Sequence, residues 1–215
     1  MIQKSNFSEE RKSRFSFYSL LSFLLFGFLV VGVENAEQVH ADSSTKAEQS
    51  STTQKSPLSQ HALFDAALKG EIKTVQTALT QGLNVNSADK EGRTTLMFAS
   101  YNGHTKIVGL LLKSGALINS RDALGRTALI YAASGPNHQT VQLLLSKKAD
   151  PNIVDKQEGW TALMYAAAEG QLRVVKTLLR FSADKTLKDA DGDTALDFAT
   201  KNNHPEVVKL LKEGS

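Results

Sequence analysis

The stretch Gly92-Arg-Thr-Thr-Leu-Met-Phe-Ala99 carries a pattern, Gly-x-Thr-x-Leu-x-x-Ala, that occurs four times in the chain. The copies begin at Gly92, Gly125, Gly159 and Gly192, at intervals of 33, 34 and 33 residues. A fixed period of this size indicates one small structural unit stacked on copies of itself. Each unit buries its apolar side against its neighbours, which produces a solenoid with a long, shallow surface. We expect that surface, rather than a pocket, to carry the function.

The register extends beyond these eight residues. In every copy a valine follows the final alanine by nine residues, as Val108 follows Ala99. The same spacing relates Ala66 to Val75, which indicates a fifth, degenerate copy that begins near Pro57.

The best-preserved copy continues as Ser100-Tyr-Asn-Gly-His104 and then as Thr105-Lys-Ile-Val-Gly-Leu-Leu-Leu-Lys-Ser-Gly-Ala116. Its period, its Thr-x-Leu-x-x-Ala helix start and its Gly-x-x-x-x-Val-x-x-Leu-Leu second helix resemble the ankyrin repeat, over roughly Pro57 to Ser215. The resemblance implies an all-α solenoid of about five helix-turn-helix units with short β-hairpin finger loops. The expected repeat domain spans 58–215, with units at about 58–88, 89–121, 122–154, 155–188 and 189–215.

Particular residues are expected to start and end the helices. A threonine hydroxyl can accept from the free N–H groups of a first turn, so we expect first helices to begin at Thr94, Thr127, Thr161 and Thr194. A left-handed residue is favoured just after a helix, so we expect first helices to end at Gly70, Gly103, Gly170 and Asn203. In the third unit Pro136 occupies this position, and Gly135 is expected to make the turn instead. Lys148 and Ser182 replace the glycines Gly82 and Gly115 that close second helices, and a side chain disfavours positive φ there.

The N-terminus has the composition of an export signal. Four basic residues, Lys4 to Arg14, precede an uncharged run from Phe15 to Val33, and Val39-His40-Ala41 offers a signal peptidase site. Residues 1–41 are therefore expected to be a cleaved signal peptide. The run is also long enough to span a bilayer, so a retained membrane anchor at 15–33 is the alternative. No cysteine follows the run, which excludes a bacterial lipoprotein anchor.

Composition places further bounds on function. Residues 42–57 are mostly Ser, Thr, Gln, Lys and Glu, which predicts a disordered linker. The net charge is +3, and segment 1–41 carries four basic and four acidic residues, so its removal leaves the balance unchanged. This modest charge does not favour nucleic acid as a partner. The absence of cysteine fits an exported bacterial protein that relies on stacking rather than on disulfides.

Catalytic and metal-binding patterns are lacking. His104 stands where ankyrin repeats commonly carry a structural histidine, and His138 and His204 lie near the same corner, so hydrogen bonding is expected there. A zinc site would need several converging ligands. The tip Asp189-Ala-Asp-Gly-Asp193 is similar to a calcium loop in composition, but it lacks the required residue order and the distant glutamate. No nucleophile elbow, zinc helix or phosphate loop occurs, so we expect no catalytic residue, no metal and no cofactor.

Protein binding is better supported. In ankyrin repeats the partner usually meets the finger tips and the exposed side of the first helix. The matching tip residues are Lys90, Glu91, Arg93, Leu124, Arg126, Lys156, Gln157 and Trp160, and the matching first-helix residues are Tyr101, Asn102, Ser134 and Glu169. Arg93, Arg126 and Trp160 share one position in three successive units, and Arg and Trp are enriched at binding hot spots. We expect them to form one column, suited to a partner with acidic groups beside an apolar knob.

Two sets of apolar residues have alternative interpretations. Trp160 either contacts the partner or packs locally, on the inserted tip residue or against Arg126. In the first case Trp160→Ala should weaken binding and leave folding nearly intact. Met97, Ile130 and Met164 either extend an apolar strip along the groove or are buried between helices.

The sequence thus predicts a monomeric, non-enzymatic repeat array that is exported to the envelope or exterior of a bacterium and binds another protein. A membrane-tethered adaptor or an inhibitor- or immunity-type protein is the alternative. A hydrolase or metal-dependent enzyme would need a polar constellation that the sequence does not show. Membrane contact is expected only through an uncleaved N-terminal segment.

Overall fold

The structure, a computed structural model, describes residues 58–213. The expected signal peptide at 1–41, the alternative anchor at 15–33 and the linker at 42–57 lie outside the described residues. Within 58–213, no helix combines the length and the apolar character that a membrane crossing requires.

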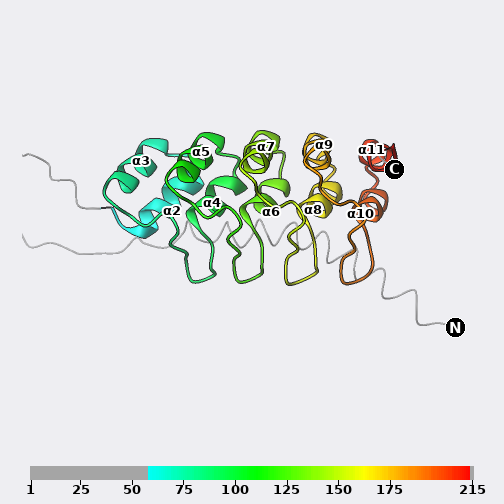
Figure 1. The fold of residues 1–215 in the computed structure, drawn as a ribbon, viewed down its shortest axis with the longest axis horizontal. Helices are drawn as coiled ribbons and strands as arrows, with labels where there is room; N and C mark the ends of the chain where they lie inside the picture. The colour runs from blue at the N-terminus through cyan, green and yellow to red at the C-terminus, as the bar shows by residue number, and fades with distance from the viewer. Residues whose placement is uncertain (1–57, 214–215) are drawn as a thin grey trace, which may run out of the picture. The chain divides into compact units, whose positions relative to one another are not determined.

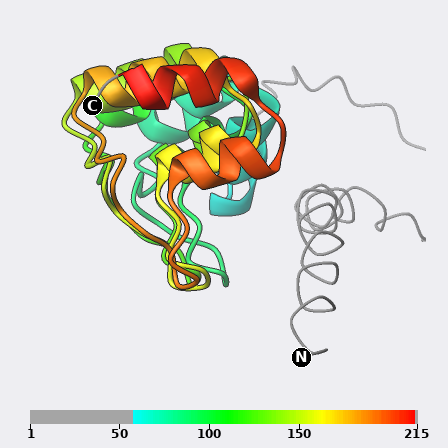
Figure 2. The same ribbon diagram turned by 90° about the vertical axis from the view of Figure 1, so that its right-hand side faces the viewer.

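Residues 58–213 form five consecutive helix pairs (Figure 1). The first helices of the pairs are α2 (Gln60–Lys69), α4 (Thr95–Tyr101), α6 (Ala128–Ala133), α8 (Ala162–Ala168) and α10 (Ala195–Lys201). The second helices are α3 (Ile72–Thr80), α5 (Thr105–Lys113), α7 (His138–Ser146), α9 (Leu172–Arg180) and α11 (Pro205–Glu213). First and second helices form two rows, and the finger loops extend beyond the row of first helices, away from the second helices (Figure 1, Figure 2). The predicted all-α repeat solenoid is confirmed. The fingers are hairpin-like, and the β pairing among the described residues is one isolated bridge, Ala88–Thr94.

The recurring Thr, Leu and Ala positions start the first helices and fill the core. Each of the four predicted threonine hydroxyls accepts from the backbone N–H three residues later, at 3.2–3.4 Å. The leucines of the pattern in the second, third and fourth units, Leu96, Leu129 and Leu163, are 1% exposed. The alanines Ala99 and Ala132 are fully buried, which permits close approach of the two helices of a unit. The core is therefore one apolar layer between the two rows of helices.

Corner residues follow the predicted pattern with one exception. Gly70, Gly103, Gly170 and Asn203 have positive φ, as do Gly82 and Gly115 and the side-chain-bearing Lys148 and Ser182. Gly135, however, is not among the positive-φ residues, so the prediction for the third unit is wrong. Pro136 occupies the corner position itself, and its ring fixes φ at a negative value. The His138 N–H still donates to the Pro136 carbonyl at 3.0 Å, as the Thr105 N–H donates to the Gly103 carbonyl at 2.8 Å in the second unit.

Polar side chains at the corners tie the second, third and fifth units to the unit before each. His104 Nε2 donates to the Leu68 carbonyl at 3.0 Å, and His204 Nε2 donates to the Ala168 carbonyl at 2.9 Å. Both carbonyls lie in the last turn of the preceding unit's first helix, where carbonyls lack helical partners. In the third unit the Asn137 amide donates to the Tyr101 carbonyl at 2.9 Å. The structural interpretation of His104 and His204 is confirmed.

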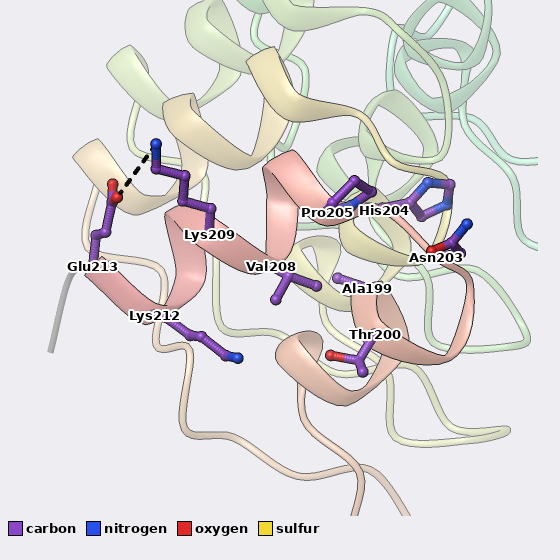
Figure 3. A pocket seen from close by; sticks show the side chains of 9 residues that line it. All are labelled: Ala199, Thr200, Asn203, His204, Pro205, Val208, Lys209, Lys212 and Glu213. Atoms are coloured by element: carbon purple, nitrogen blue, oxygen red, sulfur yellow. Dashed lines mark ion pairs between the residues drawn. The ribbon is translucent and has the colours of Figure 1, made fainter.

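The last unit is expected to exchange its amide hydrogens faster than the middle units. Helix α11 contacts a second helix on one side only, whereas α5 lies between α3 and α7. Its outer side is a shallow hollow lined by Val208, Lys209 and Glu213, with an ion pair of 3.9 Å between Lys209 and Glu213 (Figure 3). Because local stability follows the number of packed neighbours, hydrogen exchange should show less protection at 209–212 than at 107–112. Equal protection would contradict this interpretation.

Candidate interaction surface

An aspartate organises each finger tip from within. Asp89, Asp122, Asp155 and Asp189 each turn Oδ1 towards backbone N–H groups of their own tip, at 2.8–3.1 Å. The N–H of each of these aspartates also donates to the carbonyl four or five residues later and closes the finger. An aspartate that hydrogen-bonds its own backbone in this way is a strong turn former. The tips are therefore ordered loops.

Neighbouring tips are joined to one another by backbone hydrogen bonds. The Ala123 N–H donates to the Glu91 carbonyl at 2.9 Å, and the Lys156 N–H donates to the Leu124 carbonyl at 2.8 Å. A third bond runs from the Ala190 N–H to the Glu158 carbonyl at 2.9 Å. Four tips thus form one continuous row, visible as the aligned loops of Figure 1.

The two tip arginines fold back onto their own units. The Arg93 guanidinium lies 2.6 Å from Asp89 Oδ2 and 5.0 Å from the centre of the Phe98 ring. The Arg126 guanidinium lies 3.0 Å from Asp122 Oδ2 and 4.8 Å from the centre of the Tyr131 ring. Their side chains are 20% and 26% exposed. The guanidinium groups of both arginines are thus already engaged by carboxylates and rings.

Trp160 links the fourth unit to the fifth. Its ring centre lies 5.0 Å from that of Tyr165 and 4.3 Å from that of Phe198, and its Nε1 donates to Asp189 Oδ2 at 3.1 Å. We expected local packing, if it occurred, against Arg126 or the inserted residue. The indole packs on Phe198 of the C-terminal unit, so its removal is expected to lower stability rather than leave folding nearly intact.

An aromatic column that sequence analysis missed underlies the tips. Phe98, Tyr131, Tyr165 and Phe198 occupy the seventh position of the repeated pattern, and this recurrence was the available signal. The Tyr131 hydroxyl donates to Asp122 Oδ2 at 2.7 Å, and the Tyr165 hydroxyl donates to Asp155 Oδ2 at 2.9 Å. Burial raises the pKa of both phenols, and these carboxylates raise it further. Both tyrosines therefore stay neutral donors that hold their tips against the first helices.

The remaining candidate residues divide into exposed and structural ones. Lys90, Leu124, Lys156, Gln157 and Glu169 are exposed, and Glu91 is half-exposed. Partial burial raises the pKa of Glu169, an effect that His204 opposes. The other three have contacts within the array: Asn102 donates to the Leu68 carbonyl, the Ser134 hydroxyl donates to the Tyr131 carbonyl, and Tyr101 meets Tyr131 edge-on. Met97, Ile130 and Met164 are 1–2% exposed, which supports burial rather than an apolar strip.

The acidic tip of the last unit shows no cation geometry. The carboxylate oxygens of Asp189 accept hydrogen bonds from backbone N–H groups and from Trp160 Nε1. Asp193 forms an ion pair with Lys201. Among residues 58–213, no group of three His, Cys, Asp or Glu side chains converges as metal ligands would.

A family model for ankyrin repeats matches three overlapping segments, 44–122, 63–155 and 129–215. The match covers most of the chain, and the chain belongs to the ankyrin-repeat family. Ankyrin repeats are protein–protein interaction modules, and the family is typically non-enzymatic. A search of the curated proteins gives no match to the chain.

Proposed function

We propose that this chain is an exported protein that binds a protein partner through its row of finger tips and the adjoining side of the first helices. The observation that carries the proposal is the hydrogen-bonded row of tips, because an ordered surface loses little conformational entropy on binding. Export is supported by the sequence of residues 1–41. The chain is proposed to act by binding and not by catalysis.

The exposed tip residues define the chemistry of the partner. Leu124 is 41% exposed and lies on a tip bonded on one side to the Glu91 carbonyl and on the other to the Lys156 N–H. Lys90 and Lys156 are exposed on the flanking tips. Because Arg93 and Arg126 are engaged internally, these lysines are the cations that a partner can reach. The surface fits a partner that presents an apolar side chain with carboxylates on either side.

Tip binding can be tested with a matched pair of leucines. A photo-crosslinking residue at position 124 of the full chain should capture the partner in the cells that make the protein, and one at position 142 on α7 should not. With the captured partner, Leu124→Ala should raise Kd about tenfold, or about 1.4 kcal/mol. Leu117→Ala is the control, since Leu117 is 63% exposed but lies outside the tips. If Leu117→Ala weakens binding and Leu124→Ala does not, the interface lies elsewhere.

The mature N-terminus is expected to be Asp42, because Val39-His40-Ala41 places suitable residues at the −3 and −1 positions of a signal peptidase site. Edman degradation or mass spectrometry of the exported protein measures this directly. An intact Met1 in the membrane fraction would support the tethered alternative, with the apolar run 15–33 as the anchor.

A further inference from the structure

The outward side of the second helices carries segregated positive charge. On α5 and α9, exposed cations recur at positions that share one helical stripe, and the exposed Lys147 follows the last residue of α7. We call these six residues the basic face: Lys106, Lys113, Lys147, Arg173, Lys176 and Arg180. Helices α5, α7 and α9 contain no aspartate or glutamate. Within 58–213, no ion pair joins any of the six to a carboxylate.

Helix electrostatics account for only part of this charge. Lys113 and Arg180 lie in the last turns of α5 and α9, where the helix dipole favours a cation. Lys106 and Arg173 are the second residues of the same helices, where the dipole favours an anion. The equivalent residue of α11 is Glu206, which the dipole does favour. The cations at the amino ends of α5 and α9 are therefore placed against local helix stability, which points to a role in binding.

The second helices, which contain five of the six residues of the basic face, and the finger tips lie on opposite sides of the row of first helices (Figure 1, Figure 2). A partner on the tips would therefore leave the basic face accessible. Among the described residues, the exposed large apolar side chains are Leu117, Leu124 and Val154, and none belongs to α5, α7 or α9. A specific protein interface has an apolar core, which this face lacks, although two of its six cations are arginines. Separated cations, mostly lysines that act as point charges, suit a broad anionic surface instead.

We propose that the basic face docks the array on the surface of an anionic phospholipid membrane, with the tips turned away from the bilayer. Each cation near an anionic leaflet strengthens binding by roughly fivefold, so six are ample for a reversible contact. The contact serves both forms of the protein, since residues 34–57 would join the array to an anchor at 15–33, and a cleaved form would bind peripherally. From the sequence, membrane contact was expected only through the N-terminal segment. The basic face adds a second membrane contact, on the repeat array itself.

The absence of cysteine from the chain allows a clean labelling experiment. Gln142→Cys places a fluorophore on α7, between α5 and α9, and Gln157→Cys places one on a tip; both side chains are exposed. The full chain is reconstituted in phosphatidylcholine vesicles with or without about one third phosphatidylglycerol, together with a headgroup-attached quencher. Quenching at position 142 should be at least ~5-fold stronger with the anionic lipid and should vanish at about 0.5 M salt, where charges are screened within a few ångströms. Quenching at position 157 should be weak in both.

Charge reversal separates binding from folding. Lys106→Glu with Arg173→Glu should reduce quenching at position 142 to the neutral-lipid level. The same change should leave the Tm equal or higher, because the helix dipole favours glutamate there. Lys90→Glu with Lys156→Glu makes the same charge change on the tips and should leave quenching intact. Equal quenching in both lipids, or an equal loss in the tip variant, would overturn the proposal. Protection of position 142 by soluble polyglutamate but not by anionic vesicles would overturn it in favour of an acidic protein.

Discussion

Leu129→Ala should lower the free energy of unfolding by about 2–5 kcal/mol, the range found when a buried leucine is truncated. Leu129 is 1% exposed and lies in α6, which packs between α4 and α8 at the centre of the array. The cavity would therefore face residues of the units on both sides. Because stability in a repeat protein is a sum of unit and interface energies, a defect in the central unit weakens two interfaces at once. Urea denaturation followed by circular dichroism measures the loss.

Leu124→Ala is the matched control for this prediction. Leu124 belongs to the same unit and loses the same atoms, but it is 41% exposed on a tip. Its truncation should change stability by no more than about 0.5 kcal/mol, as surface substitutions usually do. Two assignments depend on this difference: Leu129 to the core and Leu124 to the binding surface. If the two variants lost similar stability, both assignments would be untenable.

The interior of each unit was predictable because it depends on spacing within one repeat. The cap at Thr127, the burial of Leu129 and the left-handed Gly103 all follow from contacts or backbone geometry within about a dozen residues. The error at Gly135 is also local. Pro136 takes the corner position and cannot adopt positive φ, and Gly135, one residue earlier, does not take over the left-handed conformation.

The orientation of the tip side chains was not predictable in the same way. A tip residue meets both its own first helix and the next unit, as Trp160 meets Phe198 and Asp189. The distances between side chains of neighbouring units depend on how one unit is oriented on the next. The repeat period alone does not predict that orientation. Spacing assigns Arg93 and Arg126 the same position in their units, but it does not predict their carboxylate and ring partners.

The spatial distribution of charge was also not predictable from the sequence composition. A net charge of +3 describes an unremarkable protein. Once the helices are placed, the cations of α5 and α9 share one side and neither helix contains an acidic residue, while Asp189, Asp191 and Asp193 gather on a tip. The net charge does not reveal this separation, because the positive and negative charges largely cancel in the sum.

Trp160→Ala should destabilise the protein by about 2–3 kcal/mol, somewhat below the range for a fully buried aromatic residue. The indole is only half-buried, but it packs on Tyr165 and Phe198 and donates a hydrogen bond to Asp189. Aromatic pairs of this kind contribute about 0.5–1.5 kcal/mol beyond the area that they bury. The fifth unit has a neighbour on one side only, so the loss should concentrate there. Hydrogen exchange in α10 and α11 should accelerate before exchange in α4 to α7 changes.

Trp160→Phe separates the ring contacts from the hydrogen bond. Phenylalanine keeps an aromatic face against Phe198 and loses the donor to Asp189, so the cost should fall to about 0.5–1.5 kcal/mol, the usual net contribution of one hydrogen bond. The same pair of variants tests the candidate binding role of Trp160. If partner affinity follows stability, weak for alanine and nearly intact for phenylalanine, the indole acts by fixing the last two tips. If both variants lose affinity alike while phenylalanine stays folded, the indole N–H side of the ring contacts the partner directly.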